Sequence, residues 1–233
     1  MKKMIIASTS TVFGSGYLEY LLPTLKEHFK NVKTLVFIPF ARPGGITYDA
    51  YTEIAKKAFS KINIDVKGVH EFENKEKAIL NAEAIFTGGG NTFELVNQLY
   101  TNNVLGILKD VLENGTPYLG TSAGSNICGV NMMNTNDMPI VYPPSFKTLE
   151  CIPFNINAHY LDPIEGSTHM GETRETRIKE FHVFNKTAVL GLREGSWLFV
   201  EGDKITLKGK YTARLFRQNK LPTELESGVE VFI

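Results

Sequence analysis

The chain has only two cysteines, no excess of either charge and no long apolar run, and each absence excludes a class of protein. Cys128 and Cys151 lie far apart without metal-type spacing, so neither a disulfide framework nor a cysteine metal site is expected. Both thiols are predicted to be reduced and buried. Twenty-five basic residues balance twenty-five acidic ones, which gives no general attraction for nucleic acid or an anionic membrane surface.

Membrane and export signals are also missing from the sequence. No stretch approaches the about 18 consecutive apolar residues of a membrane-spanning helix. The apolar run at residues 4–7 is far shorter than the about 7–15 residues of a signal peptide's hydrophobic region, and polar residues follow it. A cytoplasmic protein is therefore predicted. Without internal repeats or low-complexity linkers, 233 residues with 42% hydrophobic content suit a single domain over residues 1–233.

Short apolar runs alternate with segments of helical period through the first half of the chain. This alternation predicts an α/β fold with a mainly parallel, doubly wound sheet and helices on both faces. Pro23 is expected either to kink the first helix or to mark its true first turn. The predicted strands cover residues 4–7, 34–38, 64–69, 84–87 and 117–121, and the predicted helices cover 17–30, 48–62, 74–81, 92–100 and 104–113.

The pattern changes after residue 126. Residues 131–150 are polar, contain prolines and lack periodicity, which predicts a long loop. A short strand within 154–162 should deliver His159 to a loop, and an amphipathic helix is expected over 171–184. The run 188–192 is predicted to be a strand that joins the sheet, and short strands within 196–233 are predicted to extend the sheet in antiparallel fashion.

The apolar run 118–121 ends abruptly at Ser122, which stands between small residues. Gly120, Ser122 and Gly124 satisfy Gly-x-Ser-x-Gly, the pattern of a sharp strand-to-helix turn that exposes a nucleophilic serine. The backbone N–H of Ala123, at the start of the following helix, would help to bind an oxyanion. An ordinary strand–turn–helix connection is the alternative interpretation.

Gly88, Gly89 and Gly90 follow another predicted strand. Three consecutive glycines cost conformational entropy, so they indicate a main chain that approaches something closely or points N–H groups at an anion. A flexible connector is the alternative. Ligands bind at the carboxyl ends of strands in open parallel sheets, and Ser122 occupies the same edge. A dinucleotide site after Gly14-Ser-Gly16 is disfavoured, because Glu19 stands where the third glycine is needed.

A nucleophilic serine needs a base and a carboxylate that orients the base. Among the five histidines, His159 has the suitable context, since it ends a predicted strand, although a solvated loop histidine is the alternative. Asp137 and Glu194 are the candidate acids. A metal site made of His159, Asp162 and His169 lacks a recognised ligand spacing, so neither a metal nor a cofactor is predicted.

The choice between the two acids depends on how rigidly each is placed. Glu194 lies just past a predicted strand, and a strand end holds a carboxylate more steadily than a long loop does. Asp137 lies on such a loop, but it precedes His159 as in the Ser–Asp–His order of α/β hydrolases. Glu194 is therefore favoured, which would leave Asp137 to pair with the α-ammonium group of a substrate.

Five segments, taken together, resemble peptidase E, a family of serine peptidases that act as α-aspartyl dipeptidases. They occur in family order over residues 5–200: Gly88-Gly-Gly-Asn-Thr-Phe93, Gly120-Thr-Ser-Ala-Gly-Ser-Asn126, Asn157-Ala-His-Tyr-Leu-Asp162, Gly171-Glu-Thr-Arg174 and Leu192-Arg-Glu-Gly-Ser196. The resemblance implies a three-layer αβα sandwich that hydrolyses dipeptides with an N-terminal aspartate. One departure is Ala158, where bacterial members have proline, which affects the expected path of the loop but not the histidine.

The resemblance also implies a role for each matching residue. Ser122 would be the nucleophile, His159 the base, and Glu194 or Asp137 the acid. An oxyanion hole would be formed by Gly89, Gly90 and Ala123, and the substrate would be bound by Arg174, which holds its aspartyl carboxylate, and by Asn91. Arg177 is less suited to that task than Arg174, because Glu180 lies one turn further along the helix and can pair with it.

Two rival functions remain open. A cyanophycinase would share the fold and the nucleophile but cleave at aspartyl residues of a polymer, which a short chain without an added domain makes less suitable. A catalytically silent small-ligand sensor would not need serine, histidine, carboxylate and glycines together. The predicted partner is a small peptide with an N-terminal aspartate, rather than nucleic acid or a membrane, and both a monomer and a homodimer are compatible with the sequence.

Overall fold

The computed structural model describes residues 1–163, 166, 168 and 170–233. Its first half alternates strands and helices as predicted. The elements are β1 (Lys3–Ala7), a 3-10 turn (Glu19–Leu21), α1 (Leu22–His28), β2 (Thr34–Ile38), α2 (Tyr48–Ser60), β3 (Asp65–Gly68), a second 3-10 turn (Val69–Glu71), α3 (Lys75–Leu80), β4 (Ile85–Thr87), α4 (Thr92–Thr101), α5 (Leu105–Glu113), β5 (Tyr118–Thr121) and α6 (Ala123–Asn126). Pro23 lies in the first turn of α1, which confirms the second of its two predicted positions.

The second half adds one helix and six strands to the described structure. They are β6 (Asn155–Ala158), α7 (Arg174–Phe184), β7 (Val189–Leu192), β8 (Ser196–Glu201), β9 (Lys204–Gly209), β10 (Ala213–Phe216) and β11 (Thr223–Leu225). The helix predicted over 171–184 begins only at Arg174, because the Thr173 side chain accepts a hydrogen bond from the backbone N–H of Thr176 and so caps the helix.

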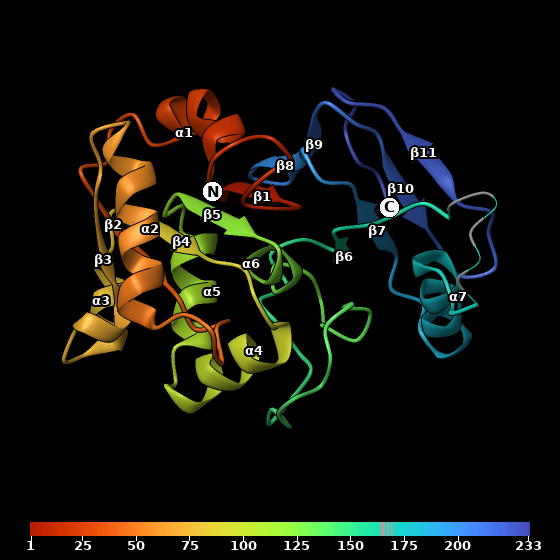
Figure 1. Ribbon diagram of the computed structural model, residues 1–233, viewed down its shortest axis with the longest axis horizontal. Helices are drawn as coiled ribbons and strands as arrows, with labels where there is room; N and C mark the ends of the chain where they lie inside the picture. The colour runs from red at the N-terminus through yellow and green to blue at the C-terminus, as the bar shows by residue number, and fades with distance from the viewer. Residues whose placement is uncertain (164–165, 167, 169) are drawn as a thin grey trace.

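A seven-stranded sheet with the order β3-β2-β4-β5-β1-β8-β9 forms the centre of the molecule (Figure 1). β1 to β5 run parallel, whereas β8 pairs antiparallel with β1 and β9 pairs antiparallel with β8. The registers place Ala7 beside Thr121 and Thr87 beside Gly120. Segments that leave β1, β4 and β5 at their carboxyl ends therefore meet at one edge of the sheet.

Helices cover both faces of this sheet, which confirms the doubly wound, three-layer arrangement (Figure 1). α1 and α2 bury Leu25 and Phe59 against one face, where Phe37 and Phe86 lie. α3, α4 and α5 pack against the other face through residues such as Leu95. Burial on both faces explains why the inner strands β1, β2, β4 and β5 are mostly apolar, whereas the edge strand β3 alternates between buried and exposed residues. Each fully buried Leu or Phe contributes about 1.5–3 kcal/mol.

A second sheet, with the order β11-β10-β7-β6, lies beside the first and is covered by α7 (Figure 1). This corrects two predictions. The strand at 188–192 joins the second sheet and not the first, and only β8 and β9 of the last four strands extend the main sheet. An apolar strand pattern is compatible with either sheet. The pairing partners were decided by tertiary packing, in which α7 covers a cluster that contains Val189 of β7 and Phe216 of β10.

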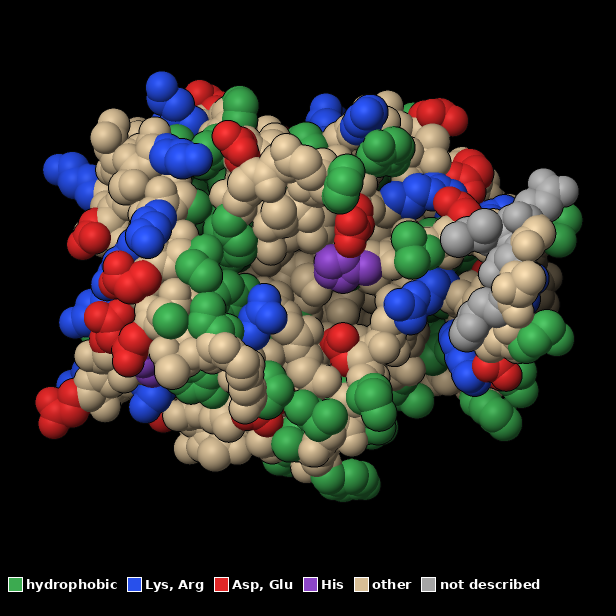
Figure 2. All heavy atoms as spheres, viewed as in Figure 1, with side chains coloured by type: hydrophobic (Ala, Val, Ile, Leu, Met, Phe, Trp, Pro, Cys, Tyr) green, Lys and Arg blue, Asp and Glu red, His purple; other side chains and the backbone are tan. Residues whose placement is uncertain are grey.

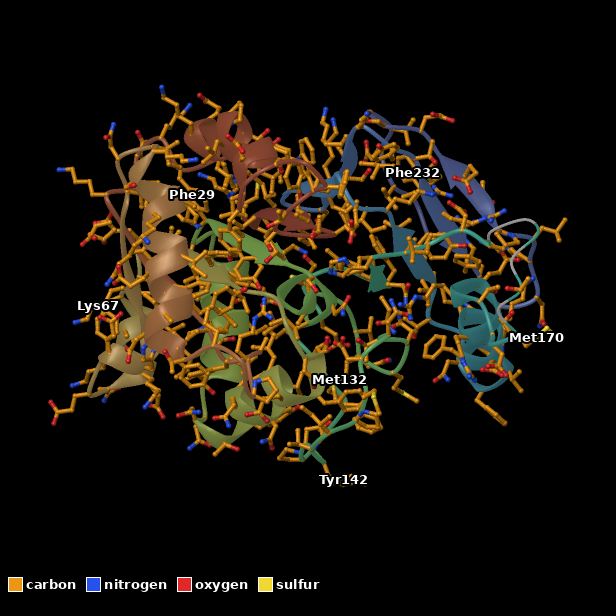
Figure 3. The ribbon with its side chains drawn as sticks, viewed as in Figure 1. Phe29, Lys67, Met132, Tyr142, Met170 and Phe232 are labelled. Atoms are coloured by element: carbon orange, nitrogen blue, oxygen red, sulfur yellow. The ribbon has the colours of Figure 1, made fainter. Side chains whose placement is uncertain are left out.

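The predicted loop over 131–150 is present, with only an isolated bridge between Asn131 and Lys147. Figure 3 labels two of its residues: Met132 is packed into the core, whereas Tyr142 is 92% exposed. Both cysteines are free and buried, as predicted, and burial raises the pKa of each thiol. Within the described residues, no helix has the length and apolar character needed to cross a bilayer.

Candidate active site

Ser122 lies at a sharp turn between β5 and α6, where its backbone has φ 55° and ψ −113°. Such angles cost on the order of 1–3 kcal/mol, so the surroundings must hold them. The Ser122 N–H donates to the carbonyl of Ala7 over 3.1 Å. A Cβ atom on Gly120 would collide with the carbonyl of Gly124, and one on Gly124 would collide with that of Thr87. The small residues of the Gly-x-Ser-x-Gly pattern are therefore required by the turn itself.

His159 connects Ser122 to Glu194. Its Nε2 atom lies 2.9 Å from Ser122 Oγ, and its Nδ1 atom lies 2.6 Å from Glu194 Oε1. A carboxylate can only accept, so Nδ1 carries the proton of the neutral ring and Nε2 is left to accept from the serine hydroxyl. This is the arrangement in which a serine can transfer its proton to histidine while it attacks a carbonyl.

The backbone of His159 is held by Ser8, a residue for which sequence analysis proposed no role. His159 has φ 54°, and its N–H donates to Ser8 Oγ over 2.9 Å. Ser8 Oγ in turn donates to the carbonyl of Leu192 over 2.7 Å, and its side chain is fully buried. The sequence signal is weak: Ser8 directly follows a buried strand at the sheet edge that carries Ser122, a position that does not by itself reveal a structural hydroxyl.

We expect Ser8→Ala to destabilise the fold by about 1–3 kcal/mol, because the His159 N–H and the Leu192 carbonyl lose their partner. It should also lower kcat on the order of tenfold by loosening the histidine. Thr148→Val is the control, since it removes a buried hydroxyl that donates to Gly129 instead. Urea unfolding and turnover would be measured on both variants. Equal effects of the two on kcat would contradict a specific role for Ser8.

Gly89 packs directly beside the serine, and Gly88 and Gly90 pack closely against other residues, so the flexible-connector interpretation is wrong. A Cβ atom on Gly89 would lie 2.8 Å from Ser122 Cβ, and one on Gly88 would lie 2.6 Å from Tyr51 Oη. Gly90 has φ +146°, where a Cβ atom would collide with the carbonyl of Ala41. Only glycine lets this main chain approach Ser122 so closely.

The three N–H groups assigned to an oxyanion hole differ in their hydrogen bonding. The Gly89 N–H donates to Tyr51 Oη over 2.9 Å, and the tyrosine hydroxyl donates to the Gly89 carbonyl. Among the hydrogen bonds of the described residues, the N–H groups of Gly90 and Ala123 have no acceptor. The N–H groups of Gly90 and Ala123 are thus available to an oxyanion. Gly89 instead leaves room beside Ser122, and its backbone is hydrogen-bonded to the buried tyrosine.

Residues 4–208 match the model of Peptidase family S51. The chain belongs to this family. Among its relatives, "Peptidase E" from Streptomyces coelicolor (strain ATCC BAA-471 / A3(2) / M145) is 46% identical over 228 residues, which cover 98% of this chain and 93% of the relative. The Drosophila melanogaster protein named "Probable alpha-aspartyl dipeptidase" is 43% identical over 227 residues, with 96% and 93% coverage.

The fold of this S51 peptidase also occurs in a solved structure, that of a peptidase from an acI-B1 Actinobacterium. The two agree with a TM-score of 0.75 at 12% identity, over 100% of this chain and 97% of the other. The predicted resemblance to peptidase E and the predicted hydrolase activity on peptides are therefore confirmed.

Asp137, the second candidate acid, is engaged at the start of α4. Its Oδ2 atom accepts from the Thr92 N–H over 2.7 Å and from Thr135 Oγ1 over 3.0 Å. Asn91 caps the same helix by accepting from the Glu94 N–H over 3.0 Å, and its amide donates to the carbonyl of Met138 over 2.9 Å. Asp137 therefore does not contact His159, whose carboxylate partner is Glu194. Asn91 connects the glycine turn to the loop that carries Asp137.

The two arginines of α7 line the same cavity but differ in their ion pairs. Arg177 pairs with Glu172 at 2.6 Å and with Glu180 at 2.9 Å, so its predicted surface pairing is confirmed. Arg174 is half-buried and has no ion pair with any described residue. It lines a cavity of about 410 Å³ together with Asn136, whose amide donates to the carbonyl of Ala158, next to His159. Arg174 thus faces a cavity that adjoins the histidine segment.

The alternative metal site combined His159 with Asp162 and His169. His169 lies outside the described residues, and Asp162 is bound to Arg193 at 2.7 Å. Within the described parts of the chain, no three His, Cys, Asp or Glu side chains are placed to hold a metal.

On the face shown in Figure 2, a histidine borders a hollow near the centre, with an acidic group beside it and basic groups on both sides.

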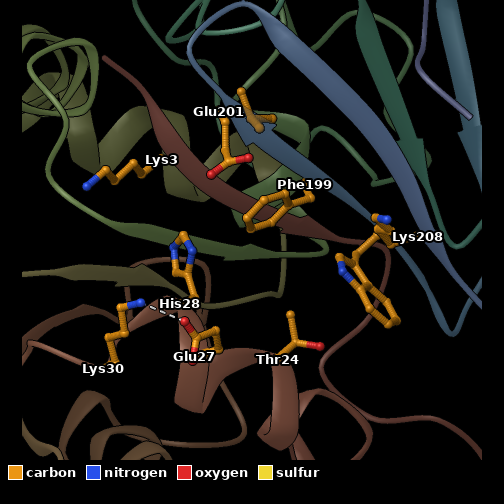
Figure 4. A pocket seen from close by; sticks show the side chains of 10 residues that line it. Lys3, Thr24, Glu27, His28, Lys30, Phe199, Glu201 and Lys208 are labelled. Atoms are coloured by element: carbon orange, nitrogen blue, oxygen red, sulfur yellow. Dashed lines mark hydrogen bonds and ion pairs between the residues drawn. The ribbon is translucent and has the colours of Figure 1, made fainter. Parts of the chain in front are cut away.

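A separate cavity of about 500 Å³ lies at the opposite edge of the main sheet, where β1 begins and β8 ends (Figure 4). Lys3, His28, Phe199 and Glu201 line it, and none of them contacts Ser122 or His159. Burial lowers the pKa of His28 to about 4, so its ring is neutral at neutral pH. None of its lining residues belongs to the segments that carry Ser122, His159 and Glu194, so the cavity is not part of the candidate active site.

Proposed function

We propose that this S51 peptidase hydrolyses dipeptides with an N-terminal aspartate through an acyl-enzyme on Ser122. The observation that carries the proposal is the chain of hydrogen bonds from Ser122 to His159 to Glu194, at 2.9 and 2.6 Å, beside the N–H groups of Gly90 and Ala123. We further propose that residues 1–233 act as one domain on free small peptides in the cytoplasm.

In the proposed reaction, Ser122 Oγ attacks the scissile carbonyl while His159 Nε2 takes the hydroxyl proton. The carbonyl oxygen becomes an oxyanion, which accepts from the N–H groups of Gly90 and Ala123. His159 then gives its proton to the leaving amine, and the C–N bond breaks. Water repeats the sequence on the acyl-enzyme, with His159 as base, and releases aspartate. Glu194 holds the ring and stabilises the imidazolium that forms in both steps.

Arg174 is proposed to bind the aspartyl side chain. A carboxylate that leaves water needs a fixed cation, and a guanidinium offers two parallel hydrogen bonds. Arg174 lines a cavity together with Asn136, which bonds the segment that carries His159, and this supports the proposal. Asp137 is proposed to pair with the α-ammonium group, because one of its oxygens is engaged at α4 and the other is left for a ligand. The name of the Drosophila relative supports the aspartyl preference.

The direct experiment offers Asp-Leu, Glu-Leu, Asn-Leu and Leu-Leu side by side, with and without a chelator. Hydrolysis of Asp-Leu alone, unaffected by the chelator, is the expected result. Release of aspartyl units from a polymer without cleavage of Asp-Leu would favour the cyanophycinase alternative. Loss of activity with the chelator would contradict a purely serine-based mechanism.

Arg174→Met should remove most of the preference for Asp-Leu over Asn-Leu, because the aspartyl carboxylate then lacks its cation. We expect kcat/KM for Asp-Leu to fall on the order of 10²-fold, whereas that for Asn-Leu changes little. Arg177→Met is the matched control, since it removes a paired arginine of the same helix. If Arg174→Met retains the parental selectivity and Arg177→Met loses it, Arg177 holds the substrate instead.

A further inference from the structure

His159 and Glu194 reach the site on two separate loops. His159 follows β6 and Glu194 follows β7, and these strands are parallel neighbours in the second sheet (Figure 1). The side chains of His159 and Glu194 are 38% and 46% exposed, respectively. Burial therefore does little to fix them, and a partly solvated ion pair contributes little to its own order. Ser8 joins the two segments where the strands end, so a contact beyond that point is needed to hold the loops that carry the two side chains in register.

Arg193 and Asp162 provide such a contact. Arg193 immediately precedes Glu194, and Asp162 follows His159 by three residues. The guanidinium binds the carboxylate through two parallel hydrogen bonds, Nε to Oδ2 at 2.7 Å and Nη2 to Oδ1 at 2.7 Å. A bidentate pair fixes orientation as well as distance. Because Arg193 is only 16% exposed, solvent screens this pair less than it screens the pair of His159 and Glu194.

The surroundings of Arg193 restrict it further. Its guanidinium lies over the ring of Tyr160, 5.6 Å from the centroid, and its Nη1 atom donates to Glu224 over 2.9 Å. Arg214, on β10, approaches Asp162 only to 3.5 Å and through one nitrogen, so it adds little to the orientation of that carboxylate. The hydrogen bonds from Arg193 hold the pKa of the Asp162 carboxyl below its ordinary value, so the pair stays charged at neutral pH.

We propose that Arg193 and Asp162 are positioning residues, which clamp the two loops and hold Glu194 against His159. The inference rests on the proposed function, because it assigns the clamp to the proton transfer between His159 and Ser122. Neither residue bonds to Ser122 within the described structure, so the clamp acts through the histidine and not on the substrate.

Arg193→Met tests the clamp, because it keeps an aliphatic side chain over Tyr160 but removes the fork. We expect kcat for Asp-Leu to fall about 10- to 100-fold with KM within about twofold of the parent, since a displacement of about 1 Å costs that much in an active site. Arg214→Met is the matched control. Arg214 belongs to the same cluster of charges but is not next to Glu194 in the chain. Its loss should therefore leave kcat within about twofold of the parental value.

Asp162→Asn extends the test to a double-mutant cycle. The double variant Arg193→Met with Asp162→Asn should lose no more kcat than the more affected single variant, because both changes break one contact. Independent, multiplying losses would overturn the proposal, as would an equal loss in Arg214→Met or a rise in KM with kcat unchanged. If Arg193→Met does not fold, Arg193→Lys is the alternative, because it keeps the charge but lacks the planar guanidinium. It should show a smaller loss of kcat.

A second readout separates this proposal from the choice of substrate. A small sulfonylating reagent modifies Ser122 only as fast as His159 activates it, whatever dipeptide the enzyme prefers. The rate of modification should fall in Arg193→Met and stay near the parental rate in Arg214→Met. A parent that is modified but does not cleave Asp-Leu would refute the proposed substrate and leave the clamp standing. Unchanged modification of Arg193→Met would refute the clamp.

Discussion

Replacement of Ser122 by alanine is expected to lower kcat for Asp-Leu by on the order of 10⁴-fold or more, because members of a catalytic triad act as a unit. The removed oxygen is the atom that would form the acyl-enzyme, and His159 Nε2 loses the hydroxyl 2.9 Å away. His159→Ala should cost a similar factor, since no other base lies within hydrogen-bond reach of Ser122 Oγ in the described residues.

The fold should survive both substitutions. The turn at residue 122 is held by its backbone bond to Ala7 and by Ser125, whose Oγ lies 2.6 Å from the same carbonyl, and neither contact uses the Ser122 hydroxyl. Thermal unfolding should therefore change little. His70→Ala is a suitable control for His159→Ala, because His70 also pairs with a carboxylate, Asp49, at 2.9 Å on another part of the surface. Near-parental turnover by Ser122→Ala would refute the serine mechanism.

The second large effect is expected from Glu194→Gln, which should lower kcat by about 10²- to 10⁴-fold with little change in KM. An amide can donate to Nδ1 and so favour the tautomer with its proton on Nε2, which cannot accept from Ser122. Stability should hardly change, because both Glu194 and His159 are partly exposed and such pairs contribute little.

Asp137→Asn is the comparison that separates the two acids. It should chiefly raise KM and relax the requirement for a free α-amine, since Asp137 binds the start of α4 and not the histidine. Steady-state kinetics with Asp-Leu and with its N-acetylated form would measure both effects. If Asp137→Asn abolishes kcat while Glu194→Gln remains active, the assignment of the acid is reversed.

Much of the candidate site could be predicted because its residues follow strands. Ser122 and Gly89 leave neighbouring parallel strands, β5 and β4, so their proximity followed from the order of elements. Glu194 was preferred over Asp137 because a strand end holds a carboxylate more steadily than a long loop does. Glu194 is the acid whose carboxylate lies 2.6 Å from His159. Ser8 was missed, because a lone serine after a strand has no pattern that distinguishes a structural hydroxyl from a solvated one.

The sequence by itself determined the parallel α/β core, the strained turn at Ser122 and the glycines beside it, because apolar period and small residues act over a few neighbouring positions. Only the tertiary structure decided that β6 and β7 form a second sheet, that Tyr51 occupies the N–H of Gly89, and that Arg193 binds Asp162. These contacts join segments 31 to 38 residues apart. Partners so distant in the chain are selected by packing in three dimensions, which no local pattern records.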